Sequence, residues 1–120
     1  MKRILLAEDE EVLRMLVVDT LEENDYQVDE AADGIEAVQL FDENTYDLLV
    51  LDFMMPGLTG LEVIHHVRQK NKEIKILMLS AKSQQYEQEK VIEAGANYFM
   101  AKPFSPLELK IKVEDILNEG

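Results

Sequence analysis

Five residues able to do chemistry stand at or just after the ends of short apolar runs. They are Glu8, Asp9, Asp52, Ser80 and Lys102. If these runs are parallel strands of one sheet, their carboxyl ends meet at a single edge, which is where open α/β sheets bind ligands. Three carboxylates, one hydroxyl and one ammonium group would then lie together, although they are spread over most of the chain.

Crowded carboxylates repel one another, and two like charges about 4 Å apart cost roughly 4 kcal/mol at an effective dielectric constant of 20. Either some of their pKa values rise or a cation binds among them. Because no histidine or cysteine belongs to the set, the ligands would all be oxygens, which favours Mg²⁺ or Mn²⁺. Such a cation and Lys102 could neutralise a phosphoryl group while the Asp52 carboxylate attacks it, and the Ser80 hydroxyl could hold a third oxygen.

Each of these residues has an ordinary explanation when taken alone. Asp9 could cap a helix, Lys102 could be a solvated charge, and Ser80 could be a hydroxyl satisfied nearby. His65 and His66 are neighbours that cannot share a helix face, so we interpret both as surface or boundary residues. It is the convergence of several groups at four strand ends that indicates a site.

The elements that must position these residues alternate along the chain. Apolar runs predict strands over 3–7, 27–31, 48–52, 74–80 and 98–101. Helical periodicity predicts helices over about 11–23, 35–43, 61–70, 84–94 and 106–118. The runs 48–51 and 74–79 are too continuously apolar for strands wetted on one face, and they suit central strands covered on both sides. Five strand–helix repeats predict a doubly wound α/β fold around a parallel sheet.

The apolar pattern also predicts which side chains enter the core. In the first helix, Val12, Met15, Leu16 and Asp19 recur at helical spacing, and Val18 and Leu21 widen the apolar face. We therefore expect this face to pack on the sheet. We also expect Tyr26, Phe41 and Tyr46 to be packing residues, because no basic residues interleave with these rings as they would in a nucleic-acid binding surface.

Helix ends carry their own signals. Two acidic or hydroxyl residues are followed three positions later by glutamate, the spacing of a capping box: Asp33 with Glu36, and Ser105 with Glu108. Pro106 suits the first turn of the last helix. Gly95 stands where a left-handed residue would end the fourth helix.

Composition limits the class of protein. The 120 residues, 47% hydrophobic and 31% charged, predict one globular domain over 1–120. We expect a cytoplasmic location, because the chain has no cysteine, no apolar run near the roughly 20 residues of a membrane span and no signal peptide. Residues 1–60 hold 16 acids against 3 bases, whereas 61–120 hold 9 of each. So acidic a surface argues against direct binding to nucleic acid.

From Lys2 to about Leu117, the sequence resembles the receiver domain of bacterial two-component response regulators. Five motifs carry the resemblance: LLAEDE at 5–10, DFMMPGLTG at 52–60, SAK at 80–82, GANYF at 95–99 and KPF at 102–104. The resemblance implies a flavodoxin-like fold with five helices and five parallel strands in the order 2-1-3-4-5.

The resemblance also implies a role for each motif residue. Asp52 would accept a phosphoryl group from a histidine kinase or phosphotransfer protein. Glu8, Asp9, Asp52 and the backbone carbonyl of Met54 would hold Mg²⁺. Lys102 would bind the phosphoryl group and precede a cis Lys102–Pro103 peptide. Ser80 would supply the hydroxyl that moves to the phosphoryl group, and Phe99 would be the aromatic residue that changes position. Met54 and Lys82 would tune dephosphorylation.

Such a domain catalyses its own phosphorylation and slow dephosphorylation, yet it serves mainly as a switch. Phosphorylation would change the surface formed by the fourth helix, fifth strand and fifth helix. That surface would then signal to a protein partner or relay the phosphoryl group to it. On that face Gln84, Gln85, Tyr86 and Gln88 form a polar stretch with little charge and a single aromatic residue, which weakly favours a relay. The first helix and the loop after the fifth strand would meet the phosphodonor. We expect a monomer, or a weak dimer on phosphorylation, and no membrane contact.

Several positions depart from the common family pattern. Glu8 stands where many receivers have aspartate, and Phe99 replaces the commoner tyrosine, which removes a hydroxyl from the switch. Our hypothesis is that apolar Met54 shields the acyl phosphate from water and slows its hydrolysis. The last expected helix ends two residues before Gly120, so we expect a receiver without an attached output domain.

Three other functions remain as alternatives. A degenerate receiver would bind partners without phosphorylation, but the complete set of site residues argues against it. A haloacid-dehalogenase-type phosphatase would need a second aspartate where Met54 stands, together with a cap insertion for which there is no room. A flavodoxin-like nucleotide or flavin binder would need a glycine-rich loop after Ala7, and none is there.

Overall fold

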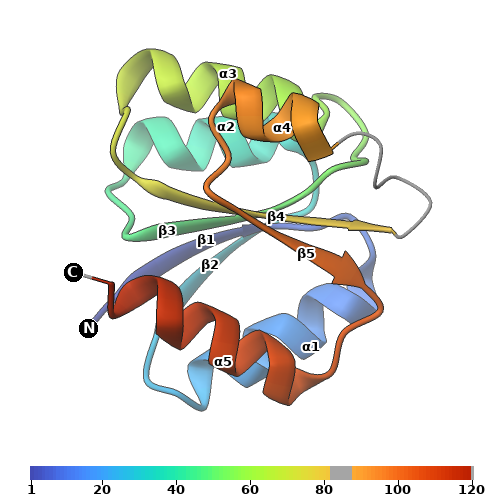
Figure 1. Cartoon of the computed structure of the whole chain (residues 1–120), viewed down its shortest axis with the longest axis vertical. Coiled ribbons are helices and arrows are strands. Elements are labelled where there is room, and N and C mark those ends of the chain that lie inside the picture. Colours follow the sequence, from blue (N-terminus) through green and yellow to red (C-terminus); the bar gives the residue numbers. More distant parts are fainter. Residues whose placement is uncertain (82–87, 120) are drawn as a thin grey trace.

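The computed structural model describes residues 1–81 and 88–119 (Figure 1). Its strands are β1 (Arg3–Ala7), β2 (Gln27–Ala31), β3 (Leu48–Asp52), β4 (Lys75–Ala81) and β5 (Tyr98–Lys102). Its helices are α1 (Glu11–Glu22), α2 (Gly34–Glu43), α3 (Gly60–Lys70), α4 (Gln88–Ala94) and α5 (Pro106–Leu117). All strand pairs are parallel, and the sheet order is β2-β1-β3-β4-β5. The predicted fold and strand order are therefore confirmed.

The sheet lies between two helical layers, with α1 and α5 on one face and α2, α3 and α4 on the other (Figure 1). The alternation of side chains along each strand supplies both cores. In β1, for example, Leu5 packs in the cluster under α2, α3 and α4, whereas Ile4 and Leu6 pack in the cluster under α1 and α5. All five residues of β3 are buried. This explains why its sequence is apolar throughout until Asp52.

One part of the predicted core is wrong. Val12, Met15 and Leu16 of α1 are 76%, 56% and 37% exposed, and the helix turns Val17 and Leu21 to the sheet instead. The helix carries two apolar stripes, and periodicity alone does not say which one faces the sheet. The burial of Val18 and Leu21 was predicted correctly, and Phe41 and Tyr46 are buried as expected.

The ends of the elements agree with their local signals. Asp33 and Ser105 accept hydrogen bonds from the backbone N–H groups of Glu36 and Glu108, as predicted, and Ser105 completes a full capping box. Gly95 ends α4 with φ +125°. Another capping box was missed in the sequence: Thr59 with Glu62 begins α3. The spacing of those two residues was a sufficient signal for it.

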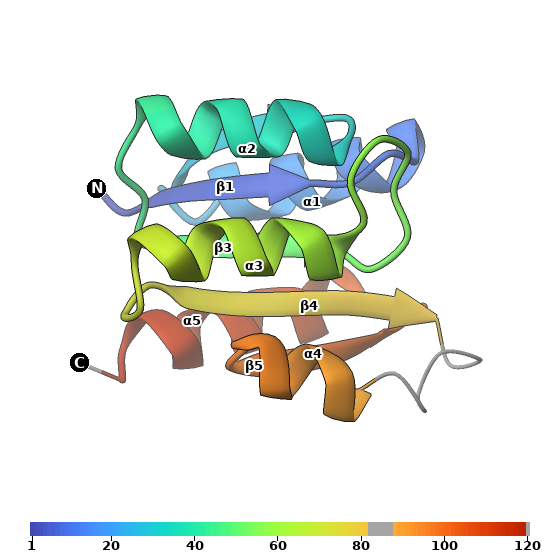
Figure 2. The same ribbon diagram turned by 90° about the horizontal axis from the view of Figure 1, so that it is seen from above.

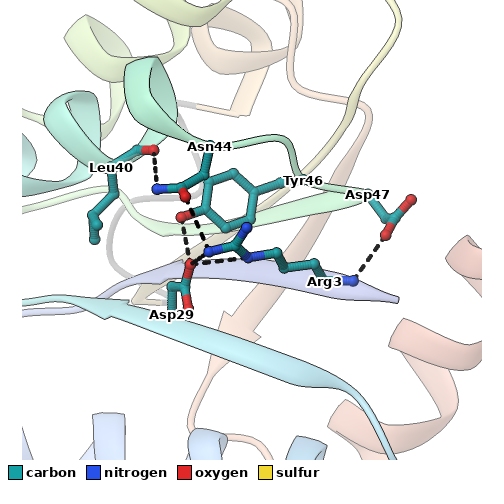
Figure 3. Close-up of polar contacts among 6 residues, drawn as sticks. All are labelled: Arg3, Asp29, Leu40, Asn44, Tyr46 and Asp47. Atoms are coloured by element: carbon teal, nitrogen blue, oxygen red, sulfur yellow. Dashed lines mark hydrogen bonds and ion pairs between the residues drawn. The ribbon is translucent and has the colours of Figure 1, made fainter. Parts of the chain in front are cut away.

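A polar cluster ties three segments together near the start of β1 (Figure 3). The Arg3 guanidinium donates to Asp29 Oδ2 at 2.6 Å and to Asn44 Oδ1 at 3.1 Å, and it lies over the Tyr46 ring. The Tyr46 hydroxyl donates to the same Asp29 oxygen at 2.7 Å. Burial, followed by the charge and hydrogen bond of Asp29, raises the pKa of Tyr46. The cluster joins β1 and β2 to the loop before β3.

Within residues 1–81 and 88–119, no helix combines the length and the apolar character that a membrane span requires.

Candidate active site

The predicted site residues gather at the carboxyl edge of the sheet. The arrowheads of β1 and β4 point to the same side of the molecule (Figure 2). Strand register then sets the neighbours: Asp52 pairs with Leu79 across β3 and β4, and Ala81 pairs with Lys102 across β4 and β5. β5 runs one residue further than predicted, so Lys102 is its last residue. β4 likewise runs from Lys75 to Ala81, one residue later than predicted at both ends.

Three carboxylates form the centre of the site. Glu8, Asp9 and Asp52 each offer an oxygen within 4.8 Å of the other two. Glu8 is fully buried, Asp52 is 5% exposed and Asp9 is exposed. The predicted convergence of these acids is confirmed, and Asp9 lies on the solvent-exposed side of the cluster.

Lys102 supplies the positive charge between two of these acids. Its Nζ atom lies 2.8 Å from Glu8 Oε1 and 3.0 Å from Asp52 Oδ1. Burial alone would lower the pKa of Lys102, but its close ion pairs with the two acids outweigh burial and raise it. The lysine is therefore held in its charged form.

The same surroundings disfavour the charged form of Asp52. Burial first, and then the negative charge of Glu8, raise the pKa of Asp52 from its ordinary 3.8 to about 7, although Lys102 pulls it down. One ammonium group thus does not fully compensate the acidic cluster.

The donor set fits a hard divalent cation. Glu8 Oε1 is buried and makes no hydrogen bond of good geometry with any described residue, despite its close ion pair with Lys102. Two carboxylates beside it have free lone pairs, and all the donors are oxygens. An ion with a few protein ligands and several waters, such as Mg²⁺, would satisfy this oxygen and relieve the repulsion.

Backbone contacts hold Glu8 in place. Its N–H donates to Ala31 O at 3.0 Å, and its side-chain Oε2 accepts from the Glu10 N–H at 3.1 Å. Its backbone oxygen accepts from Arg14 NH1 at 2.8 Å. Arg14 was not predicted to belong to the site, because nothing in its spacing connects it with the acids.

The loop after β3 is pressed against the strand ends. Phe53 N–H donates to Leu79 O at 2.9 Å, and Gly60 N–H donates to Phe53 O at 2.9 Å. A Cβ atom on Gly60 would lie 2.6 Å from the Asp52 carbonyl oxygen, so only glycine allows this approach. Met54 lies within this loop, two residues after Asp52, with its side chain 55% exposed.

Ser80 and Phe99 occupy the places from which a switch could act. Ser80 is buried, and its hydroxyl donates to Ala81 O at 3.3 Å rather than to Asp52. Phe99, on β5, is half-buried and packs against the cluster under α2, α3 and α4. The Lys102–Pro103 peptide is cis, as expected. Lys82, Gln84, Gln85 and Tyr86 lie outside the described residues, so the expectations placed on them stay predictions.

Comparison with known proteins agrees with this geometry. The family described as response regulator receiver domain matches residues 4–114. The chain is 41% identical to the alkaline phosphatase synthesis transcriptional regulatory protein PhoP of Bacillus subtilis, over 99% of this chain and 50% of that protein. It is 36% identical to the phosphate regulon transcriptional regulatory protein PhoB of Escherichia coli, over 98% of this chain and 52% of that protein. The chain thus spans about half the length of these curated relatives.

Solved structures show the same similarity. The response regulator TrrA of Thermotoga maritima, in complex with Mg²⁺ and BeF, has a TM-score of 0.87 and 41% identity, covering 97% of this chain and 99% of that one. The chemotaxis response regulator CheY4 of Vibrio cholerae has a TM-score of 0.92 and 30% identity, covering 97% and 98% respectively.

Proposed function

This chain belongs to the family of response regulator receiver domains, and from that premise we propose that it is a Mg²⁺-dependent phosphorylation switch over residues 1–120. In this proposal Asp52 accepts a phosphoryl group from a histidine kinase or a histidine phosphotransfer protein. The observation that carries the proposal is the placement of Lys102 within 3.0 Å of Asp52, beside a cluster of three carboxylates.

Glu8, Asp9, Asp52 and the Met54 carbonyl would hold Mg²⁺, which would offset the repulsion among the acids and neutralise phosphoryl oxygens. The Asp52 carboxylate then forms a bond to phosphorus as the bond from phosphorus to the donor imidazole nitrogen breaks. Lys102, already charged and 3.0 Å from Asp52, binds an oxygen of the transferred group. The burial of Asp52 restricts water access to the acyl phosphate.

The output would begin at Ser80. Among the described residues, its hydroxyl bonds to Ala81 O alone, at 3.3 Å, and it could exchange this long bond for one to a charged phosphoryl oxygen. That movement would vacate space into which the Phe99 ring turns. The face made of α4, β5 and α5 would then change its population of states and signal or relay to a protein partner. Differential contacts worth a few kcal/mol are enough for such a shift.

The phosphodonor would dock on α1, beside the site. Val12, Met15 and Leu16 form an exposed apolar stripe on this helix, and Leu107 at the start of α5 is 62% exposed. Both helices start at the site edge of the sheet (Figure 1). A helical phosphodonor could cover these apolar side chains while it delivers its phosphohistidine to Asp52.

The charge of the chain bears on whether the domain binds nucleic acid. The acidic excess of residues 1–60 is unfavourable for phosphate backbones, so we propose no direct nucleic-acid contact for the described residues. We further propose that the domain acts in the cytoplasm, where kinases of this kind present their phosphohistidine, and that it is a monomer or forms a weak dimer when phosphorylated.

The decisive experiment is incubation with acetyl phosphate and Mg²⁺, read by intact mass, with beryllofluoride and amide NMR as the second readout. We expect the wild type to gain one phosphoryl group and Asp52→Ala to gain none. We also expect beryllofluoride to shift the amide signals of Ser80 and Phe99. A wild type that is neither modified nor shifted would refute the proposal and indicate a degenerate receiver that binds partners without phosphorylation.

A further inference from the structure

Arg14, on α1, reaches back to the turn that carries the acidic pair. Its NH1 group donates to the Glu8 backbone oxygen at 2.8 Å, and its Nε group lies 3.4 Å from Glu30 Oε1 on β2. Its side chain is only 18% exposed and contacts both the turn after β1 and strand β2. Two different nitrogens of the planar fork are thus in use at once, and a single ammonium group cannot reproduce that arrangement.

The carbonyl that Arg14 binds belongs to the peptide unit joining Glu8 to Asp9. The other side of Glu8 is fixed too, because its N–H donates to Ala31 O on β2 at 3.0 Å. Glu30, which anchors the guanidinium, is the residue immediately before Ala31. The turn after β1 is therefore tied to β2 at two adjacent peptide units, once directly and once through Arg14.

This double attachment of the turn to β2 matters most for Asp9. Within residues 1–81 and 88–119, the Asp9 carboxylate makes no hydrogen bond or ion pair, and the residue is exposed. Its place beside Glu8 and Asp52 therefore depends on the orientation of the backbone from which it projects. Glu8 has further restraints from Glu10 and Lys102, which Asp9 lacks.

We propose that Arg14 is a positioning residue for the cation site: it fixes the Glu8–Asp9 peptide so that the Asp9 carboxylate stands ready to bind the ion. The inference rests on the proposed Mg²⁺ site. Mg²⁺ demands near-ideal octahedral geometry, so the orientation of a ligand strongly affects its affinity. The charge of Arg14 works the other way, because a nearby cation disfavours a metal ion. Its ion pair with Glu30 reduces that effect, and the positioning effect dominates.

The test measures the affinity of the apo protein for Mg²⁺ alone, by calorimetry and by the amide shifts of Asp9 and Glu10. Three variants are compared with the wild type: Arg14→Met, Arg14→Lys and Lys110→Met. The last removes the same charge from α5, where Lys110 makes a 4.0 Å ion pair with Glu114 and no other ion pair with a described residue. Amide spectra without Mg²⁺ check that each variant is folded.

We expect Arg14→Met to weaken Mg²⁺ binding about 10- to 100-fold, the usual effect of losing a group that orients a metal ligand. Arg14→Lys, which keeps the charge but not the fork, should also bind more weakly than the wild type, and Lys110→Met should match the wild type. Without Mg²⁺, the altered amide signals of Arg14→Met should be confined to the turn after β1 and the end of β2.

Equal or tighter Mg²⁺ binding by Arg14→Met would overturn the proposal, since the guanidinium would then act only through its charge. Full affinity in Arg14→Lys would overturn it for the same reason. Amide changes spread through the whole of Arg14→Met would also overturn it, because the role would be general stability. A wild type that binds no Mg²⁺ would instead refute the proposed function itself.

Discussion

Replacing Asp52 with asparagine should stabilise the metal-free protein at alkaline pH. Asp52 is nearly buried, and its pKa is raised from 3.8 to about 7, first by burial and then by the charge of Glu8. The folded state therefore holds the Asp52 proton more tightly than the unfolded state does. The associated stability is fully present below about pH 4 and is lost as the pH rises through about 7.

The size of the effect follows from the same shift. A difference of about 3 pH units, at about 1.4 kcal/mol per unit, makes the ionised Asp52 about 4 kcal/mol unfavourable at pH 8. Asparagine removes the charge at similar volume, but it also loses the ion pair with Lys102. We therefore expect Asp52→Asn to gain about 2–4 kcal/mol at pH 8 and about 2–3 kcal/mol less than that at pH 5.

The assay is urea unfolding in the presence of EDTA at pH 5 and pH 8. With a slope of about 2 kcal/mol/M, the gain corresponds to a midpoint higher by roughly 1–2 M at pH 8. Mg²⁺ should narrow the gap, because it binds the folded wild type and stabilises it. Asp42→Asn is a control of opposite sign. Hydrogen bonds from Lys70 and His66 lower the pKa of Asp42, so its loss should destabilise the protein at pH 8.

Two results would refute this reasoning. One is an Asp52→Asn protein no more stable than the wild type at pH 8 in EDTA. The other is a gain of equal size at pH 5 and pH 8, which would indicate a packing effect with no contribution from the ionised carboxylate.

Three further predictions concern the loop after β3 and the opposite end of the sheet. Met54→Asn should shorten the phosphorylated half-life several-fold, because an amide can orient an attacking water and a thioether cannot; decay of the intact phosphorylated mass measures it, and an unchanged rate contradicts the shielding hypothesis. Gly60→Ala should cost about 1–3 kcal/mol, since its Cβ would lie 2.6 Å from the Asp52 carbonyl oxygen; an unchanged urea midpoint would show that the loop yields freely. Tyr46→Phe should cost about 1–2 kcal/mol through its lost hydrogen bond to Asp29, and a midpoint equal to that of the wild type would show that Arg3 alone satisfies this carboxylate.

Much of the fold could be predicted because local signals and the global pattern agree. The strands appear as short apolar runs, and burial on both faces requires β3 to be apolar throughout. Asp33 and Ser105 indicated where their helices begin, because each side chain accepts a hydrogen bond from a backbone group only three residues ahead. Such signals act within one helical turn, so they can be recognised in the sequence without knowing which elements pack against the helix.

The pattern failed where a choice between two faces had to be made. Val12, Met15 and Leu16 have the spacing of a core face, yet they are exposed on α1. Which stripe of a helix meets the sheet depends on how the whole helix is rotated by its neighbours. An apolar stripe left outside is also what a docking surface requires, so the failed prediction coincides with a proposed functional surface.

The sequence by itself determined that the three acids and Lys102 meet, because parallel strands place their last residues at one edge of the sheet. Only the tertiary structure decided how those residues act. The raised pKa of Asp52 depends on its burial and on the approach of Glu8 and Lys102, and these are distances between strands that share no local signal. The ion pair of Arg14 with Glu30 likewise exists only once α1 has folded back beside β2. Pairwise distances set electrostatics and orientation, and the chain acquires them only when it is packed.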